Sequence, residues 1–430
     1  MAEPQGSLRK EITLRHAVAL YVSSVLGSGV LVLPGLAAQV AGPASMIAWV
    51  VLSLASYPFA YTFASLSARN PASGGIYAFA KESFGFHLAT ATGWLFALWF
   101  ITGGPAVTLI AASYLAYAFP LGRTEIFLVA GAVIAGAFVV NVRGIVFSNR
   151  IQLAVVGCII ALLVLAVALS IGSVRPESFV PFLPNGLFPV GTAAALIFWS
   201  YLGYENVSNV AEEFRNPRKD FRRSIILSVV LIGSLYVSVA FVTVGTLAYK
   251  AGGSVAPFAA IFSHVLGRYG AAGTAILAVV IIFGTVNAYT AGMSRVVLAV
   301  ARDGGLPKAL ALVDTKRGAP ARCLAFLSGL SLFMLFVYYF LDVDLQTALL
   351  LPSGAAVLVY VIGSAAGVRL LRVRGMARIL PWISLAMSIV VLPFVGMLAL
   401  AGLVTGAAAL AYSWMLKRSG KSAKAVESAG

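Results

Sequence analysis

Long apolar stretches that carry hardly a charge recur along this whole chain, and they limit its fold more than any other feature. Of its residues 60% are hydrophobic and 10% are charged, and the mean hydropathy is +0.97. A soluble globular chain has about 25% charged residues, so this one cannot cover an ordinary water-facing surface. Runs of about 18 or more apolar residues cross the hydrocarbon core as helices, which pair their backbone groups internally. The sequence therefore predicts an all-α integral membrane protein.

The apolar stretches divide into twelve predicted membrane spans, which form one integrated domain over residues 10–418. The stretch 380–416 is too long for a single crossing at about 1.5 Å per residue, so we divide it near Ala401 and Gly402. The twelve predicted spans are 16–40, 45–68, 87–119, 125–142, 150–172, 190–212, 224–249, 270–300, 322–341, 347–369, 379–397 and 400–417.

The basic residues alternate between the two sides of these spans in a way that sets the orientation. With the N-terminus inside, 26 of the 30 Lys and Arg fall in inner segments. Basic residues are retained on the cytoplasmic side of a membrane. An eleven-span chain would place the C-terminal basic cluster outside, so we predict twelve spans, a multi-pass protein of the plasma (inner) membrane, and cytoplasmic N- and C-termini. Residues 419–430 are predicted to be a disordered cytoplasmic tail. The four basic residues left outside are Arg123, Arg175, Lys250 and Arg268.

Two of the predicted spans contain glycines where a helix should be continuous. The first span holds Gly27, Ser28 and Gly29, and the sixth holds Gly203. Glycine in a helix interior costs about 1 kcal/mol relative to alanine. These positions lie five spans apart, as two five-span repeats of opposite orientation require, and interrupted helices at matching positions point to the binding site of a transporter.

An interrupted helix offers backbone groups to a ligand. Free N–H groups at the start of a half-helix attract a carboxylate, and free carbonyls at the end of the other half accept from an ammonium group. A pair of such breaks suits the zwitterionic end of an amino acid. The alternative is that these glycines only allow close helix packing.

Glu205 is the one acidic residue that we place well inside a span. A carboxylate at that depth costs about 2.5–3.5 kcal/mol on insertion scales. We expect it either to carry a proton or to tie the broken sixth helix together as a hydrogen-bond acceptor.

Several function classes are not supported by the sequence. The net charge of +16 is spread over short clusters between apolar runs, so we expect no nucleic-acid partner. The two cysteines and three histidines form no metal-ligand or catalytic spacing, so we expect no metal, no cofactor and no enzyme.

Four motifs, in order, resemble the amino acid–polyamine–organocation (APC) superfamily of permeases. The resemblance covers roughly residues 10–420. The motifs are Leu26-Gly27-Ser28-Gly29-Val30, the stretch from Asn70 to Tyr77 with Lys81 to Gly85, the stretch from Phe198 to Glu205 with Glu213 to Asp220, and Ser294-Arg295 with Ala301 to Pro307.

The resemblance implies two inverted five-helix repeats, at about 14–172 and 188–371, with two further helices at about 379–417. It implies that the backbone of Ser28 and Gly29 binds a substrate carboxylate, and that the segment 74–84 closes the inner mouth. The backbone of the sixth span would face the amino group, and aromatic residues would gate or line the pocket. The implied residues are Gly27, Phe198, Trp199, Ser200, Leu202 and Gly203 for binding, and Trp199, Tyr289, Phe100 and Gly104 for gating or the pocket wall.

The sequence departs from some relatives in its fifth span, where no charged residue occurs over 151–171 and a lysine is expected. Proton coupling or amino acid exchange is our prediction, while Thr285, Thr290 and Ser294 leave a sodium site open. The predicted pocket segments carry no basic residue, which favours a neutral, apolar amino acid as substrate. The compact length and the run from Glu212 to Phe221 resemble a bacterial branch that exports neutral amino acids. An alternative is a transporter-like sensor that binds without moving substrate.

Overall fold

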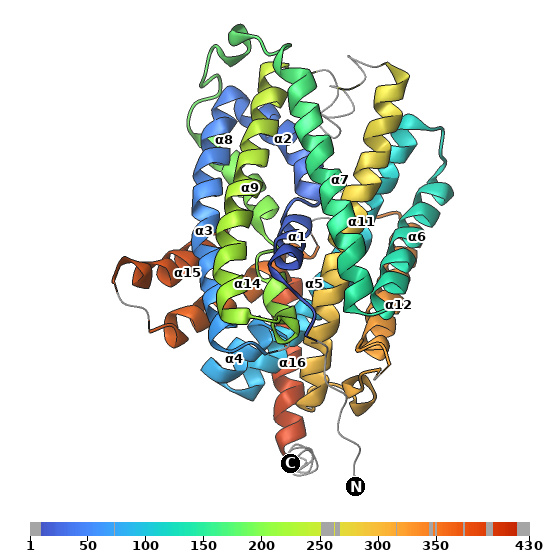
Figure 1. Cartoon of the computed structure of the whole chain (residues 1–430), viewed down its shortest axis with the longest axis vertical. Helices are drawn as coiled ribbons and strands as arrows, with labels where there is room; N and C mark the ends of the chain where they lie inside the picture. The colour runs from blue at the N-terminus through green and yellow to red at the C-terminus, as the bar shows by residue number, and fades with distance from the viewer. Residues whose placement is uncertain are drawn as a thin grey trace.

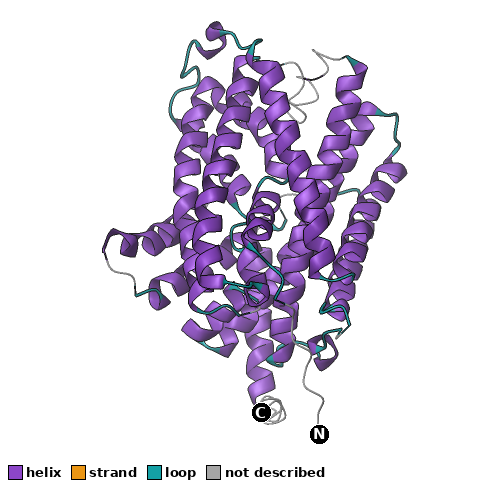
Figure 2. Ribbon diagram, in the orientation of Figure 1, coloured by secondary structure: helices purple, strands orange, loops and turns teal. Residues whose placement is uncertain are grey.

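The computed structural model describes residues 10–72, 74–250, 262, 267–314, 316–343, 347–348, 351–372, 375–392 and 399–418. In these ranges the chain is helical, and the only β pairing is two isolated bridges (Figure 2). The all-α prediction is therefore confirmed. The tail predicted at 419–430 lies outside the described residues.

The helices follow one another closely along the chain. Short 3-10 helices join or extend several of them, at Gly42–Ala44, Pro176–Phe179, Lys308–Ala311 and Gly375–Ile379. The α-helices are α1 Leu14–Val25, α2 Ser28–Ala41, α3 Ser45–Arg69, α4 Ile76–Phe84, α5 Phe86–Ala118, α6 Arg123–Val142, α7 Ile145–Ile171, α8 Phe188–Phe198, α9 Pro217–Gly245, α11 Arg268–Arg302, α12 Ala321–Phe340, α14 Ser353–Leu370, α15 Leu380–Val391 and α16 Ala399–Arg418.

Eight helical segments among the described residues are long and apolar enough to cross a membrane, and three shorter apolar helices accompany them. One of the eight, Gly29–Arg69, covers both α2 and α3. This inventory agrees with the predicted multi-pass fold of about twelve spans. The helix of the seventh span begins earlier than the predicted residue 224, because α9 starts at Pro217. Proline suits the first helical position, and the basic residues that follow it are also helical.

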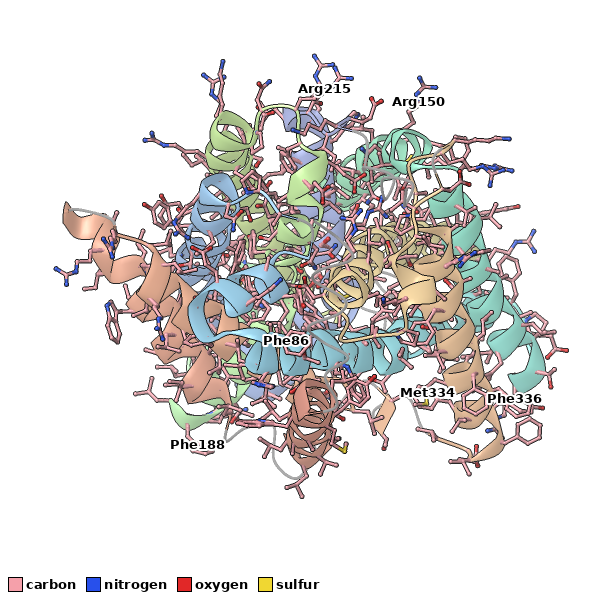
Figure 3. The ribbon with its side chains drawn as sticks, turned by 90° about the horizontal axis from the view of Figure 1, so that it is seen from below. Phe86, Arg150, Phe188, Arg215, Met334 and Phe336 are labelled. Atoms are coloured by element: carbon pink, nitrogen blue, oxygen red, sulfur yellow. The ribbon has the colours of Figure 1, made fainter. Side chains whose placement is uncertain are left out.

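Side chains on the outside of the bundle are largely apolar, as expected where lipid replaces water. Phe188 is 88% exposed and Phe336 is 57% exposed. Seen from below, both extend outward at the rim, while Arg150 and Arg215 extend from another edge (Figure 3). A soluble protein rarely exposes so much contiguous apolar surface.

The helices pair over long sequence distances. Helix α3 lies along α9, and α11 lies along α5. The short helix α4 lies at the lower end of the bundle in Figure 1, where α11 and α16 also end, and we call this the α4 end. Helix α15 departs from the common direction and runs sideways from the bundle (Figures 1 and 3).

Candidate functional site

The first predicted span is broken into two helices. Helix α1 ends at Val25, helix α2 begins at Ser28, and Leu26 and Gly27 between them are not helical. Neighbouring side chains satisfy the carbonyls at the end of α1: Thr285 Oγ1 donates to the Ser23 carbonyl at 2.8 Å, and the Tyr236 hydroxyl donates to the Val25 carbonyl at 2.6 Å. Protein donors therefore already occupy two of the carbonyls at this end of the break.

The other side of the same break is the N-terminus of α2, and no side chain caps it. The first N–H groups of a helix have no partner within it, and they carry partial positive charge. Gly27 and Gly29 line a cavity at this point. A Cβ on Gly29 would collide with Ser200 Oγ, and one on Gly27 would lie 2.6 Å from Thr285 Oγ1. Glycine is needed here because the backbone itself forms the wall.

The sixth span is broken over a longer stretch. Helix α8 ends at Phe198, a 3-10 turn covers Trp199–Tyr201, and a second 3-10 helix runs over Asn206–Glu213. Between them Gly203 adopts φ +132°, which favours glycine. A Cβ there would lie 2.7 Å from the Ser24 carbonyl oxygen, so the two breaks meet backbone to backbone.

Glu205 holds the second break together. Its buried carboxylate accepts hydrogen bonds from the Gly203 N–H at 2.8 Å, from the Tyr289 hydroxyl at 3.2 Å, and from the Tyr360 hydroxyl. An ionised carboxylate only accepts hydrogen bonds, and its two oxygens can accept from all three of these donors. This geometry is what the structural role requires, and proton carriage stays open beside it.

The two breaks and helices α5 and α11 enclose a cavity. Its volume is about 80 Å³ for the centres of water-sized molecules, and one water needs about 10–15 Å³ on that measure. The cavity therefore holds several waters or a small solute. The Ser200 hydroxyl lines it and finds no hydrogen-bond partner in the described part of the chain. Its lining is Ser24, Val25, Gly27, Gly29, Trp99, Phe100, Gly103, Gly104, Val107, Ser200, Leu202, Thr285, Val286, Tyr289 and Met293.

The structure brings most of the predicted site residues to this cavity, but not all of them. Phe198 instead packs its ring against Phe59 with centroids 5.7 Å apart, and Glu205 lies behind Tyr289. Gly203 shapes the break without lining the cavity. Of Ser28 and Trp199 only the backbone is described. The predicted residues that do line it are Gly27, Gly29, Phe100, Gly104, Ser200, Leu202 and Tyr289.

The sequence reasoning missed residues that lie one helical turn from those it found. Trp99, Gly103 and Val107 follow one another at intervals of four on α5. On α11, Met293 lies four residues after Tyr289, and Thr285, which was considered only for sodium, lies four residues before it. Residues three or four apart share a helix face, so extending the predictions from Phe100, Gly104 and Tyr289 would have found all of these except Trp99, which is adjacent to Phe100.

The hydroxyls considered for sodium each donate to a backbone carbonyl. Thr285 does so to Ser23, as above, while Thr290 donates to Val286 at 2.6 Å and Ser294 donates to Ala291 at 2.8 Å. Over the described ranges no group of three or more His, Cys, Asp or Glu side chains could hold a metal ion.

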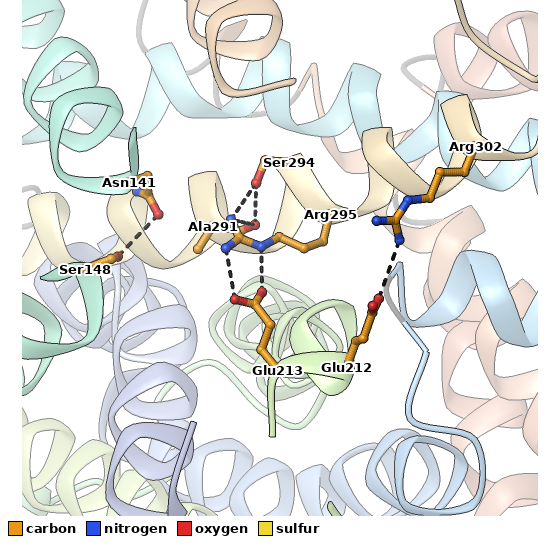
Figure 4. Close-up of polar contacts among 8 residues, drawn as sticks. All are labelled: Asn141, Ser148, Glu212, Glu213, Ala291, Ser294, Arg295 and Arg302. Carbon is orange, nitrogen blue, oxygen red and sulfur yellow. Dashed lines mark hydrogen bonds and ion pairs between the residues drawn. The ribbon is translucent and has the colours of Figure 1, made fainter. Parts of the chain in front are cut away.

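Helix α11 continues from the cavity into a layer of ion pairs. Arg295 and Glu213, only 1% and 0% exposed, pair at 2.7 Å, and Arg302 lies 3.7 Å from Glu212 (Figure 4). These pairs join α11 to the end of the sixth span. The Glu213 carbonyl in turn accepts a hydrogen bond from the Ile12 N–H at 2.9 Å, so the segment before α1 is also bonded to the end of the sixth span.

Helix α4 adds contacts on this side. Asp303 accepts from the Tyr77 hydroxyl at 2.7 Å and from Lys81 Nζ at 2.6 Å. Burial raises the pKa of Tyr77, which therefore remains a neutral donor at physiological pH. The hydrogen bond from Arg69 holds the pKa of Glu82 below its usual range. Paired charged groups thus join α4 to α3 and α11, whereas the cavity is lined by uncharged groups.

Comparison with known proteins gives a consistent family. The model of a family described as "Amino acid permease" matches residues 12–416. The chain is 35% identical over 364 residues to the amino acid permease YecA of Bacillus subtilis, covering 85% of this chain and 86% of YecA. It is 30% identical over 418 residues to the L-methionine/branched-chain amino acid exporter YjeH of Escherichia coli, covering 96% of this chain and 97% of YjeH. It is also 30% identical over 345 residues to the branched-chain amino acid permease BcaP of Bacillus subtilis, covering 74% and 72% of the two chains.

Proposed function

Because the chain belongs to the amino acid permease family of the APC superfamily, we propose that it is a secondary active transporter of a neutral, apolar amino acid. In this proposal the chain works by alternating access, performs no covalent chemistry, and exports its substrate. The proposed domain is 10–418 with repeats at 14–172 and 188–371, in the plasma membrane with both termini cytoplasmic.

The observation that carries the proposal is the uncapped N-terminus of α2 at an uncharged cavity. The substrate carboxylate would bind the N–H groups of Ser28 and Gly29, where the helix dipole favours negative charge. The substrate ammonium would face the carbonyls of the broken sixth helix around Leu202, with Trp199 as its lid. Ser200 would add its free hydroxyl.

The proposed substrate side chain is apolar because of what the remaining wall offers it. No Lys, Arg, Asp or Glu appears among the described residues that line the cavity. A charged side chain would enter without a partner at that depth, which is costly. The names of YjeH and BcaP, which specify methionine and branched-chain amino acids, agree with this substrate class. The apolar wall consists of Trp99, Phe100, Val107, Val286 and Met293.

Proton coupling or amino acid exchange is the proposed driving force. Glu205 is buried and hydrogen-bonded, and it is the candidate proton carrier. Sodium coupling is the alternative, and the counterflow experiment below distinguishes it from proton coupling and exchange.

Counterflow in proteoliposomes tests the proposal directly. Vesicles loaded with unlabelled leucine, methionine, arginine or glutamate take up the labelled form of the same amino acid, with and without sodium and a pH gradient. We expect uptake with leucine or methionine only, without a need for sodium. Uptake of arginine or glutamate would contradict the neutral substrate, and binding without uptake would identify a sensor instead of a transporter.

A further inference from the structure

At the α4 end, where α14 meets α15, arginines surround two adjoining grooves. The grooves measure about 460 and 400 Å³, and both have Arg369 and Arg372 in their walls. Arg69 completes the first groove, and Arg378 and Trp382 complete the second. Ligand sites typically have volumes of about 300–1,000 Å³, so each groove can hold a phosphate-bearing headgroup.

The positive charge in these grooves is largely uncompensated. Arg69 pairs with Glu82 at 2.5 Å, but the described residues offer no ion pair to Arg369, Arg372 or Arg378. Arg369 instead lies over the Phe84 ring, 5.7 Å from its centroid. Guanidinium groups bind phosphate oxygens through two parallel hydrogen bonds. We call Arg369, Arg372 and Arg378 the arginine corner.

Helix α15 gives the arginine corner an apolar neighbour. Its polar side faces the bundle, where Ser384 and Ser364 share a hydrogen bond of 2.8 Å. Its other side presents Trp382, 55% exposed, and Val390, 64% exposed. Because α15 runs sideways from the bundle (Figure 1), we infer that this exposed apolar side faces lipid. Tryptophan is enriched at the level of the headgroups.

We propose that the arginine corner binds the phosphate of an anionic phospholipid, with its acyl chains along the exposed side of α15. Basic pockets between membrane helices on the cytoplasmic side bind such headgroups. A free phosphate ion shares the headgroup chemistry, but it would make no use of the apolar surface of α15. The lipid is therefore the occupant, and the site is separate from the cavity at the two breaks.

Quenching of Trp382 fluorescence by brominated lipid tails tests the site. The protein is reconstituted in phosphatidylcholine that contains either brominated phosphatidylglycerol or the same fraction of brominated phosphatidylcholine. The signal of Trp382→Phe is subtracted to isolate this one tryptophan. We expect phosphatidylglycerol to quench at a lower mole fraction than phosphatidylcholine. Each Arg→Gln substitution in the arginine corner should weaken this preference about fivefold.

Three further measurements keep the test decisive. The matched control for the triple variant Arg369→Gln/Arg372→Gln/Arg378→Gln is Arg150→Gln/Arg222→Gln/Arg223→Gln, which removes the same three charges from exposed arginines elsewhere and should leave the preference intact. Arg369→Lys retains the charge, so it should preserve most of the preference if the variant is folded. Equal quenching by the two lipids would overturn the proposal, as would loss of the preference in the control. Abolition by excess inorganic phosphate would reassign the site to the free ion.

Discussion

The breaks in the first and sixth spans occupy matching positions, yet they satisfy their backbone groups in different ways. The first break is two residues long, and its carbonyls are capped by Thr285 and Tyr236 from other helices. The second is longer and is held by Glu205, a carboxylate of its own segment. Neither helix that follows a break has a side-chain cap at its N-terminus, but of the two only the N-terminus of α2 lines the cavity. The difference teaches that the first break brings a helix N-terminus to the cavity, whereas the second is held by a carboxylate of its own segment.

The largest effect is expected from Gly29→Leu. The new side chain would run into Ser200 and fill the space in front of the α2 N-terminus. We expect counterflow to fall to the level of empty liposomes while the protein remains monodisperse in detergent. Gly157→Leu is the matched control, because a Cβ there meets nothing within 4 Å. Normal transport by Gly29→Leu would mean that the first break does not bind the carboxylate.

Gly203→Ala should act on folding at the second break. Alanine is strained at φ +132°, and its Cβ would lie 2.7 Å from the Ser24 carbonyl oxygen. We expect the free energy of unfolding in mixed micelles to fall by about 3 kcal/mol. Gly186→Ala also places a Cβ at positive φ, but in open space, so it measures the strain alone. Equal losses in the two variants would show that the contact between the breaks contributes nothing.

Glu205→Ala should cost somewhat less, about 2 kcal/mol of unfolding free energy, because buried donors lose their acceptor. Glu205→Gln keeps an acceptor oxygen and should recover most of that loss. Glu177→Gln, at an exposed position, is the control. If Glu205→Ala were as stable as the wild type, Glu205 would not stabilise the second break. Transport by Glu205→Gln that no longer depends on pH would identify Glu205 as the proton carrier.

The smallest effect is expected from Tyr236→Phe, which removes one hydroxyl that bonds the Val25 carbonyl at 2.6 Å and the Ser200 carbonyl at 3.0 Å. A hydrogen bond contributes about 1 kcal/mol, so the unfolding free energy should fall by about that much. Tyr61→Phe serves as the control, since the described structure shows no hydrogen bond from the Tyr61 hydroxyl. A loss no greater than in Tyr61→Phe would show that the link between the two breaks carries no stability.

The positions of both breaks were predictable because glycine changes the local backbone energy, which depends on the residue itself. The residues that line the cavity were less predictable. The ring of Phe198 packs on Phe59, so only its backbone is left for the predicted site, while Trp99 and Met293 line the cavity without having been predicted. Which face of a broken helix points inward depends on how the segments rotate after the break, and that rotation is fixed by distant contacts.

The sequence by itself determined the membrane class, the approximate spans and the two interruptions, because hydropathy and glycine content act over a few neighbouring residues. Only the tertiary structure decided how the backbone groups at each break are satisfied. That outcome depends on Tyr236, Thr285 and Tyr360 reaching the breaks from other helices, across up to 262 positions of sequence. Hydrogen bonds of this kind form only once the bundle has assembled, so no local pattern records them.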